Sequence, residues 1–170
     1  MPYQFSTHLH NFAVWTAARA AQRGFTTSAN IAKAIVASGL REDCVDEKID
    51  WDEPVFDTYH QKWAARIIEN IRQTTGITCT YGRASKIIAI YIKTAVVLPN
   101  QGGGALAALA HPPIDRILLT NLKNSDIVTS IPSWTGLSMN QYFALIEHLR
   151  LKGFTPFWKI EAYWTISEEN

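Results

Sequence analysis

The segment that most constrains the fold is a long apolar run, RASKIIAIYIKTAVVL, from Arg83 to Leu98. Its side chains are apolar on nearly all sides, which suits either a buried strand or a central helix. The length of the run favours the helix, because buried strands are usually shorter than about 8 residues. Pro99 and the flexible segment NQGGG then end it. We therefore expect a protein built around one buried helix.

Helical periodicity also dominates the rest of the chain. Apolar positions recur at helical spacing in six further stretches, 11–24, 28–38, 55–73, 113–122, 138–151 and 156–164. The β-branched segment 74–82 has no partner strand elsewhere, so it is expected to connect two helices. The acidic segment 41–54 lacks periodicity and is expected to be a surface connection. The sequence thus predicts an all-α fold in a single domain, 1–170.

Composition narrows the class of protein. With 170 residues, of which 47% are hydrophobic and 18% charged, the chain is typical of one globular domain. Its formal net charge of +1 means that an acidic partner has to be met by a local cluster of Lys and Arg. Cys44 and Cys79 are too few for a disulfide framework and lack zinc-site spacing. We expect free thiols and a cytoplasmic protein that does not span a membrane.

Two parts of the sequence can carry chemistry. Lys86 and Lys93 lie two helical turns apart on one otherwise apolar face, and apolar surroundings favour the neutral amine, which is the nucleophilic form. The motif HPPIDR follows downstream. Pro113 is well suited to the first position of a helix, which places Asp115 where the helix dipole and free amides stabilise a carboxylate. Together an amine and a carboxylate can cleave a glycosidic bond.

These residues carry a family resemblance. GRASKIIAIYIK followed by HPPIDRILL resembles the helix-hairpin-helix DNA glycosylases, in which a glycine-ended hairpin leads into a helix with a catalytic lysine, and Pro-Val-Asp opens the next helix. Pro113-Ile114-Asp115 matches that motif with Ile for Val. The two lysines of KIIAIYIK are most similar to the archaeal-type 8-oxoguanine glycosylases. The resemblance spans Gly82 to Leu119 and implies a helix-hairpin-helix-like element within 74–122.

The resemblance also implies an activity. It implies a DNA N-glycosylase of base-excision repair that needs no cofactor or metal and acts as a monomer on double-stranded DNA carrying a modified base. Asp115 would be the activating carboxylate and Lys86 a Schiff-base nucleophile, which would add lyase activity. The segment TGITCTYG, however, departs from the usual hairpin. Strict alignment on Gly82 puts Ala84 at the lysine position, and Asp115 would then act alone as in a monofunctional hydrolase.

Other residues are assigned to binding. Enzymes that extrude a base stack it on aromatic side chains, and Trp158, Glu161 and Trp164 fall at helical spacing, so we expect them to form the base pocket. The residues expected to contact DNA are Gly82, Arg83, Lys93, Arg116, Arg19 and Arg23.

Two other interpretations remain open at the level of sequence. In the first, the chain is a non-catalytic helical module that binds DNA or another partner, and Asp115 is only a helix cap. In the second, the Pro-Ile-Asp motif is coincidental and the tryptophans belong to the core. The sequence does not identify the base, and it does not separate repair from defence against foreign DNA.

Overall fold

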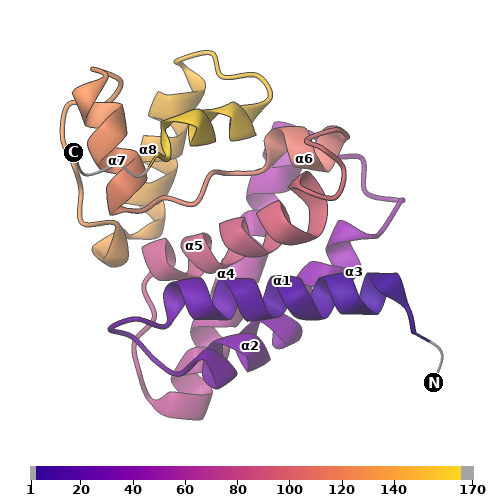
Figure 1. Cartoon of the computed structure of the whole chain (residues 1–170). Helices are drawn as coiled ribbons and strands as arrows, with labels where there is room; N and C mark the ends of the chain where they lie inside the picture. Colours follow the sequence, from indigo (N-terminus) through magenta and orange to yellow (C-terminus); the bar gives the residue numbers. More distant parts are fainter. Residues whose placement is uncertain (1–2, 166–170) are drawn as a thin grey trace.

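The computed structural model describes residues 3–165, and every regular element within them is helical (Figure 1). The elements are α1 (Phe5–Ala21), α2 (Ser28–Ala37), α3 (Leu40–Cys44), α4 (Glu53–Thr75), α5 (Tyr81–Ile92), the π-helical turn η1 (Lys93–Val97), α6 (Ala105–Leu109), α7 (Arg116–Asn124), the 3-10 helix η2 (Trp134–Gly136), α8 (Met139–Arg150) and the 3-10 helix η3 (Phe157–Tyr163). The predicted all-α class is confirmed.

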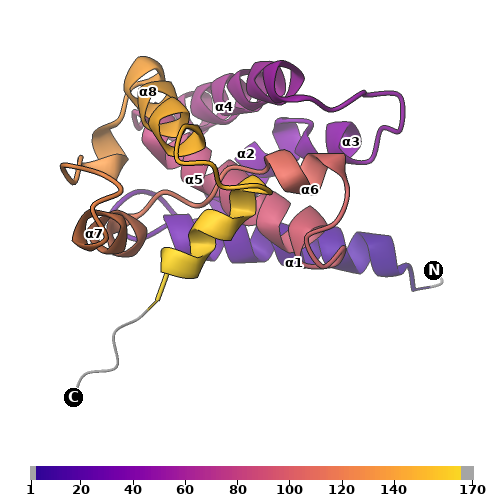
Figure 2. The same ribbon diagram turned by 90° about the horizontal axis from the view of Figure 1, so that it is seen from above.

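The apolar run is a central helix, as predicted. Figure 2 shows α5 between α1 and α4, and α5 packs against both. Ile87, Ile88 and Ile92 are buried. Thr80 caps the start of α5 by accepting a hydrogen bond from the amide of Arg83 at 3.3 Å. The last turn of the run differs from an ordinary α-helix, because η1 has π-helical geometry before the chain leaves at Pro99.

Capping residues fix several of the other helix ends. Thr27 accepts from the amide of Asn30 at 3.3 Å at the start of α2. Asp52 accepts from the amide of Val55 at 2.8 Å at the start of α4. A complete capping box opens α8, in which the side chains of Ser138 and Gln141 each accept from the other's backbone amide. Gly39 and Gly76, with φ of 78° and 72°, adopt the left-handed conformation just beyond α2 and at the end of α4.

Four expectations need correction. The first helix begins at Phe5, well before the predicted stretch 11–24. The segment 41–54 is not wholly a surface connection, because α3 occupies its beginning and the amide of Asp43 bonds the carbonyl of Gly39 at 3.1 Å. The predicted last helix is a 3-10 helix. Pro113 does not open α7, because Asp115, with extended φ of −143° and ψ of 179°, is the N-cap residue and the helix begins at Arg116.

The face of α1 that packs on the core consists of small side chains, and we call it the alanine seat. The buried residues of this helix are Ala13, Val14, Ala17, Ala18 and Ala21. With mostly methyl groups at the contact, α1 can lie close to α5 and η1, against which it packs. This face therefore positions α1 without bulky core residues of its own.

No helix of residues 3–165 is long and apolar enough to cross a membrane. Cys44 and Cys79 are both free thiols, as expected. Burial raises the pKa of each thiol to about 12, so neither is a reactive thiolate at neutral pH.

Candidate functional site

Lys86 and Asp115 meet although α5 and α7 are separate helices. The Nζ atom of Lys86 lies 3.5 Å from Oδ2 of Asp115, and the two side chains are only 12% and 13% exposed. Asp115 holds its position through its other oxygen, Oδ1, which accepts from the amide of Leu118 at 3.0 Å. The cap that starts α7 thus also aims the carboxylate at the lysine.

Two tryptophans enclose this pair. Trp164 donates from its indole Nε1 to Oδ2 of Asp115 at 3.0 Å. On the other side, Nζ of Lys86 lies 4.6 Å from the ring centre of Trp134, in a cation–π arrangement. The amine therefore meets the carboxylate with which the sequence analysis paired it, and also an indole face. Asp115 is the nearest group that can accept a proton from it.

A pocket lies near Trp164, the indole partner of Asp115. Lys93 lies 5.9 Å from the ring centre of Trp164 and forms an ion pair with Glu161. These two charged residues line a cavity of about 180 Å³, whose other walls are Val97, Leu98, Gln101, Gly102 and Trp158. Trp158 is fixed there by a hydrogen bond of 3.1 Å from its Nε1 to the carbonyl of Gly102. A cavity of this size has room for one planar ring but not for a drug-sized ligand.

The structure thus brings the three residues of the predicted base pocket to one region but gives them different contacts. Trp158 and Glu161 line the cavity, while Trp164 bonds Asp115. Glu161 is already paired with Lys93, so a ligand that uses its carboxylate has to share or displace the lysine. Trp134, to which the sequence analysis assigned no role, contacts Lys86.

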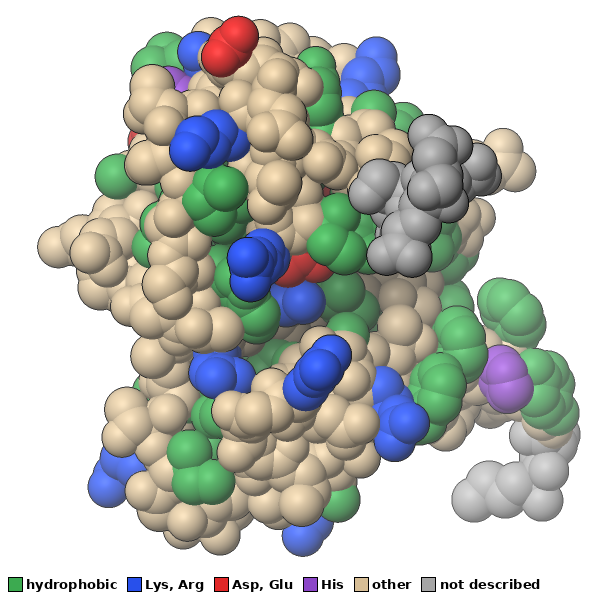
Figure 3. Space-filling view, turned by 60° about the vertical axis from the view of Figure 1, so that its left-hand side comes forward, with side chains coloured by type: hydrophobic (Ala, Val, Ile, Leu, Met, Phe, Trp, Pro, Cys, Tyr) green, Lys and Arg blue, Asp and Glu red, His purple; other side chains and the backbone are tan. Residues whose placement is uncertain are grey.

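Basic side chains surround a hollow on this side of the molecule. Figure 3 shows Lys and Arg side chains on both sides of the hollow, with basic and acidic side chains visible inside it. Of the predicted DNA contacts, Arg19, Arg23 and Arg116 are exposed. Arg83 is partly buried, donates to the carbonyl of Gly24 at 3.2 Å and lies 4.5 Å from the ring centre of Phe25.

Gly82 has a packing role. Its amide donates to the carbonyl of Leu137 at 3.0 Å, so that amide is already used within the protein. A Cβ atom at this position would lie 1.9 Å from the carbonyl oxygen of Trp134. Glycine is therefore required here because η2 packs directly on the start of α5, and this contact brings Trp134 to Lys86.

The two alignments described above place either Lys86 or Ala84 at the position of the catalytic lysine, and these two residues differ in their surroundings. Ala84 is fully buried, whereas Lys86, half a turn further along α5, faces Asp115. If the site uses an amine, Lys86 is the residue that lies within reach of the carboxylate.

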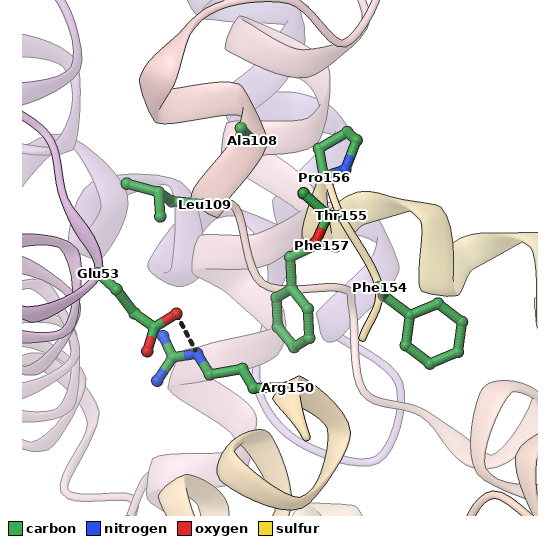
Figure 4. A pocket seen from close by; sticks show the side chains of 8 residues that line it. All are labelled: Glu53, Ala108, Leu109, Arg150, Phe154, Thr155, Pro156 and Phe157. Atoms are coloured by element: carbon green, nitrogen blue, oxygen red, sulfur yellow. Dashed lines mark ion pairs between the residues drawn. The ribbon is translucent and has the colours of Figure 1, made fainter. Parts of the chain in front are cut away.

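A second polar cluster lies elsewhere, between α4 and α8. Arg150 donates to both oxygens of Asp57 at 2.8 Å and to Glu147 at 2.5 Å. Its Nε lies 3.4 Å from Glu53 (Figure 4), and Nε2 of the buried His111 lies 3.4 Å from Asp57. Figure 4 also shows Phe157 and Leu109 on the walls of the adjoining pocket, which has a volume of about 240 Å³.

Burial and hydrogen bonds perturb this cluster strongly. Burial by itself would raise the pKa of Asp57, but hydrogen bonds from Arg150 and His111 outweigh it and hold that pKa well below its usual range. Burial lowers the pKa of His111, although Asp57 acts in the opposite direction. The neighbouring His60, whose ring centre is 4.8 Å from that of His111, is fully buried and has its pKa lowered well below 6.5 by burial.

This second cluster was not found from the sequence. Asp57 and His60 stand one turn apart on α4, which is the one local pattern that points to it. Their partners come from distant segments, since His111 precedes the prolines and Arg150 ends α8. Every charged group here has an opposite charge in contact, and the cluster ties α4 to α8.

Comparison with known proteins adds no further constraint to this geometry: no family model matches the chain, and searches of curated proteins and of solved structures returned no match.

Proposed function

We propose that this protein is a DNA glycosylase that excises a modified base from duplex DNA, with Asp115 as the activating carboxylate and Lys86 as the amine nucleophile. The observation that carries the proposal is the largely buried pair of Lys86 and Asp115, 3.5 Å apart at the start of α7. A carboxylate beside an amine supplies both groups that a Schiff-base route to cleavage of an N-glycosidic bond uses.

The pair can perform the chemistry as follows. Lys86 gives a proton to Asp115, and its amine attacks the sugar carbon C1′ while the C1′–N bond to the base breaks. The electron pair of that bond leaves with the base, which takes up the proton held by Asp115. The attached amine then loses a proton to Asp115, and its electron pair expels the ring oxygen. That oxygen takes the proton from Asp115, which leaves a protonated Schiff base between the lysine and the opened sugar. If Lys86 is bypassed, Asp115 stabilises the positive charge that develops on the sugar while water attacks C1′.

The surroundings of the pair support the same proposal. An extruded base needs a pocket near the reacting carbon, and the cavity lined by Trp158, Glu161 and Lys93 lies near Trp164, which bonds Asp115. A duplex needs cations on the flanks of the site, and Arg19, Arg23 and Arg116 are exposed. Because Oδ2 of Asp115 already has two neighbours, Lys86 and Trp164, the substrate has to enter by displacing or sharing one of them.

Borohydride trapping tests the amine role. The purified protein is incubated with a panel of duplexes, each carrying one modified base or an abasic site, and covalent adducts are counted after reduction. We expect an adduct that disappears in Lys86→Ala and remains in the control Lys33→Ala, which changes an exposed lysine on α2. The duplex that traps best identifies the class of base.

Base release tests the carboxylate role. Alkali-labile sites that form without an adduct and depend on Asp115 would reassign the enzyme to the monofunctional mechanism. If neither adducts nor alkali-labile sites appear with any duplex of a broad panel, the glycosylase proposal is wrong.

One observation favours a second candidate, a non-catalytic DNA-binding module. Both oxygens of Asp115 already accept hydrogen bonds, from Leu118 and Trp164, as they would in a purely structural cap. This candidate predicts salt-dependent binding to duplex DNA that does not discriminate modified bases and releases none of them.

A further inference from the structure

The outer face of α1 carries large aromatic side chains that are exposed among residues 3–165. Phe5, Phe12 and Trp15 are 67%, 51% and 58% exposed. Together with His8 and Arg19 they are spaced three and four residues apart, so they form one stripe on the side of the helix opposite the alanine seat. We call these five residues the α1 stripe. It runs for roughly 20 Å, given a rise of about 1.5 Å per residue. Single exposed apolar residues are ordinary, but a continuous row of aromatic rings marks an interaction surface.

The charge of α1 restricts what can cover the stripe. The sequence of the helix, FSTHLHNFAVWTAARAA, contains no Asp or Glu. Arg19 lies within the stripe and Arg23 follows just after the helix, and both are exposed. A second copy of the same face would bring these cations together with no acid from either helix to neutralise them. An anionic partner supplies the missing charge.

The stripe also continues toward the candidate site. Beyond the end of α1, Phe25 and Arg83 form an aromatic–arginine contact, with the guanidinium 4.5 Å from the ring centre. Arg83 lies one turn before Lys86 on α5, and Lys86 faces Asp115. In Figure 3 hydrophobic side chains gather on the projecting helix, and basic side chains lie between them and the hollow. A flat anionic surface such as a lipid bilayer cannot follow this path into a hollow, whereas a flexible polyanion can.

We propose that the α1 stripe is a docking surface for an unpaired nucleic-acid strand that runs from the candidate site along α1. Successive bases stack on Trp15, Phe12 and Phe5, and Arg19 and Arg23 meet the phosphates. Phe12 and Trp15 are already stacked on each other, with ring centres 5.8 Å apart and planes at 25°, so their exposed rings form a stable platform. The inference rests on the proposed function only for the choice of a nucleic acid as the polyanion.

Binding of a fluorescent oligothymidylate without any modified base tests this inference independently of base release. We expect Trp15→Ala and Phe12→Ala each to weaken binding by roughly tenfold, the effect of losing one stacking platform. Trp15→Phe should retain most of the affinity. Arg19→Gln should reduce the slope of log affinity against log salt by about 0.7, as expected for one phosphate contact with a single strand. The control is Leu151→Ala, which removes a side chain that is 85% exposed beyond α8 and should leave binding unchanged.

Three results would overturn the inference. The first is oligothymidylate binding that is absent or insensitive to the stripe variants. The second is Trp15-dependent binding to phosphatidylserine vesicles in a protein that does not bind the oligonucleotide. The third is a dimer, detected by sedimentation, that Trp15→Ala dissociates. If the protein releases bases from duplexes but its strand binding does not depend on the α1 stripe, this inference is wrong and the glycosylase proposal stands. Stripe-dependent strand binding without base release defeats only the glycosylase proposal.

Discussion

The two ionic clusters of this protein are built from similar groups but differ in the number of carboxylates that surround the cation. Around Arg150 three carboxylates and a buried histidine converge, and Asp57 binds the guanidinium through both oxygens. Around Asp115 there is one ammonium, one indole N–H and one backbone amide. Arg150 and Glu53 of the first cluster themselves line a pocket, whereas the cavity near the second cluster is lined by Lys93 and Glu161 and by neither Lys86 nor Asp115.

The identity of the cation matters as much as the number of partners. A guanidinium does not lose its proton in proteins, so Arg150 can only hold charge in place. An ammonium beside a carboxylate can exchange a proton with it and become a nucleophile. The proposed proton transfer therefore needs a lysine, as at position 86, and the guanidinium of Arg150 cannot take that role.

The largest expected effect separates the two clusters by activity. Asp115→Asn should lower the single-turnover rate of base release by about 10²–10⁴-fold, because the amide cannot take up a proton or balance a developing positive charge. Folding should change little through the cap, since asparagine is as good an N-cap as aspartate. Rapid-quench kinetics and thermal unfolding measure the two quantities. An unchanged rate in a folded Asp115→Asn protein would contradict any catalytic role of this residue.

The converse substitution should act on stability. Asp57→Asn leaves Arg150 and His111 without their shared carboxylate and should lower the free energy of unfolding by about 2–3 kcal/mol, near the range for breaking a largely buried pair. Urea unfolding measures it. Because Asp57 has no contact with Asp115 or Lys86 in the structure, the rate of base release per folded molecule should stay the same. A selective loss of activity would show that the two clusters are coupled.

Acid should destabilise the cluster between α4 and α8. The pKa values of His60 and His111 are lowered from the ordinary 6.5 in the folded protein, so only the unfolded chain takes up these protons just below that pH. The contribution of the two neutral histidines to the free energy of unfolding is therefore complete above about pH 6.5. As the pH drops below 6.5, the free energy of unfolding decreases by at most about 1.4 kcal/mol per pH unit for each proton. Urea unfolding between pH 7 and 5 should be less steeply pH-dependent in His60→Phe and unaffected by His8→Gln, which changes an exposed residue.

The smallest effect concerns the hydrogen bond that holds Asp115. Trp164→Phe keeps an aromatic ring but removes the N–H that bonds Oδ2, and we expect the single-turnover rate to fall roughly tenfold, as for loss of one hydrogen bond to a charged group. The indole N–H resonance of Trp164 should shift in Asp115→Asn, which reports the contact without any substrate. Trp51→Phe makes the same change away from the site and should leave the rate unaltered. If the chemical shift of the Trp164 indole N–H does not change in Asp115→Asn, the hydrogen bond is absent in solution.

The parts of this structure that the sequence predicts are those set by neighbours along the chain. Ser138 and Gln141 predict the start of α8, because both members of a capping box lie within one turn. The length of the apolar run of α5 is enough to predict a central helix. Asp115 was expected at a helix start, and only its position as N-cap rather than within the first turn had to be corrected.

Contacts between distant segments could not be predicted in this way. Trp164 and Asp115 are 49 positions apart, Lys93 and Glu161 are 68 apart, and Asp57 and Arg150 are 93 apart. The sequence placed Lys86 near Asp115 only through a family resemblance. It gave no indication that Trp134 would cover the amine, because that contact depends on the close packing of η2 on Gly82.

The alanine seat of α1 has a consequence for how such a site can change. The helix that carries the aromatic rings rests on α5 through methyl groups, and Ala13 and Ala17 are fully buried. Adding even one or two carbon atoms at these positions would push α1 outward, since a close-packed interior has little room to absorb them. Substitutions at the buried alanines of α1 can therefore change the distance between α1 and the candidate site on α5. Selection for a bulkier or slimmer ligand can act on residues that never touch it.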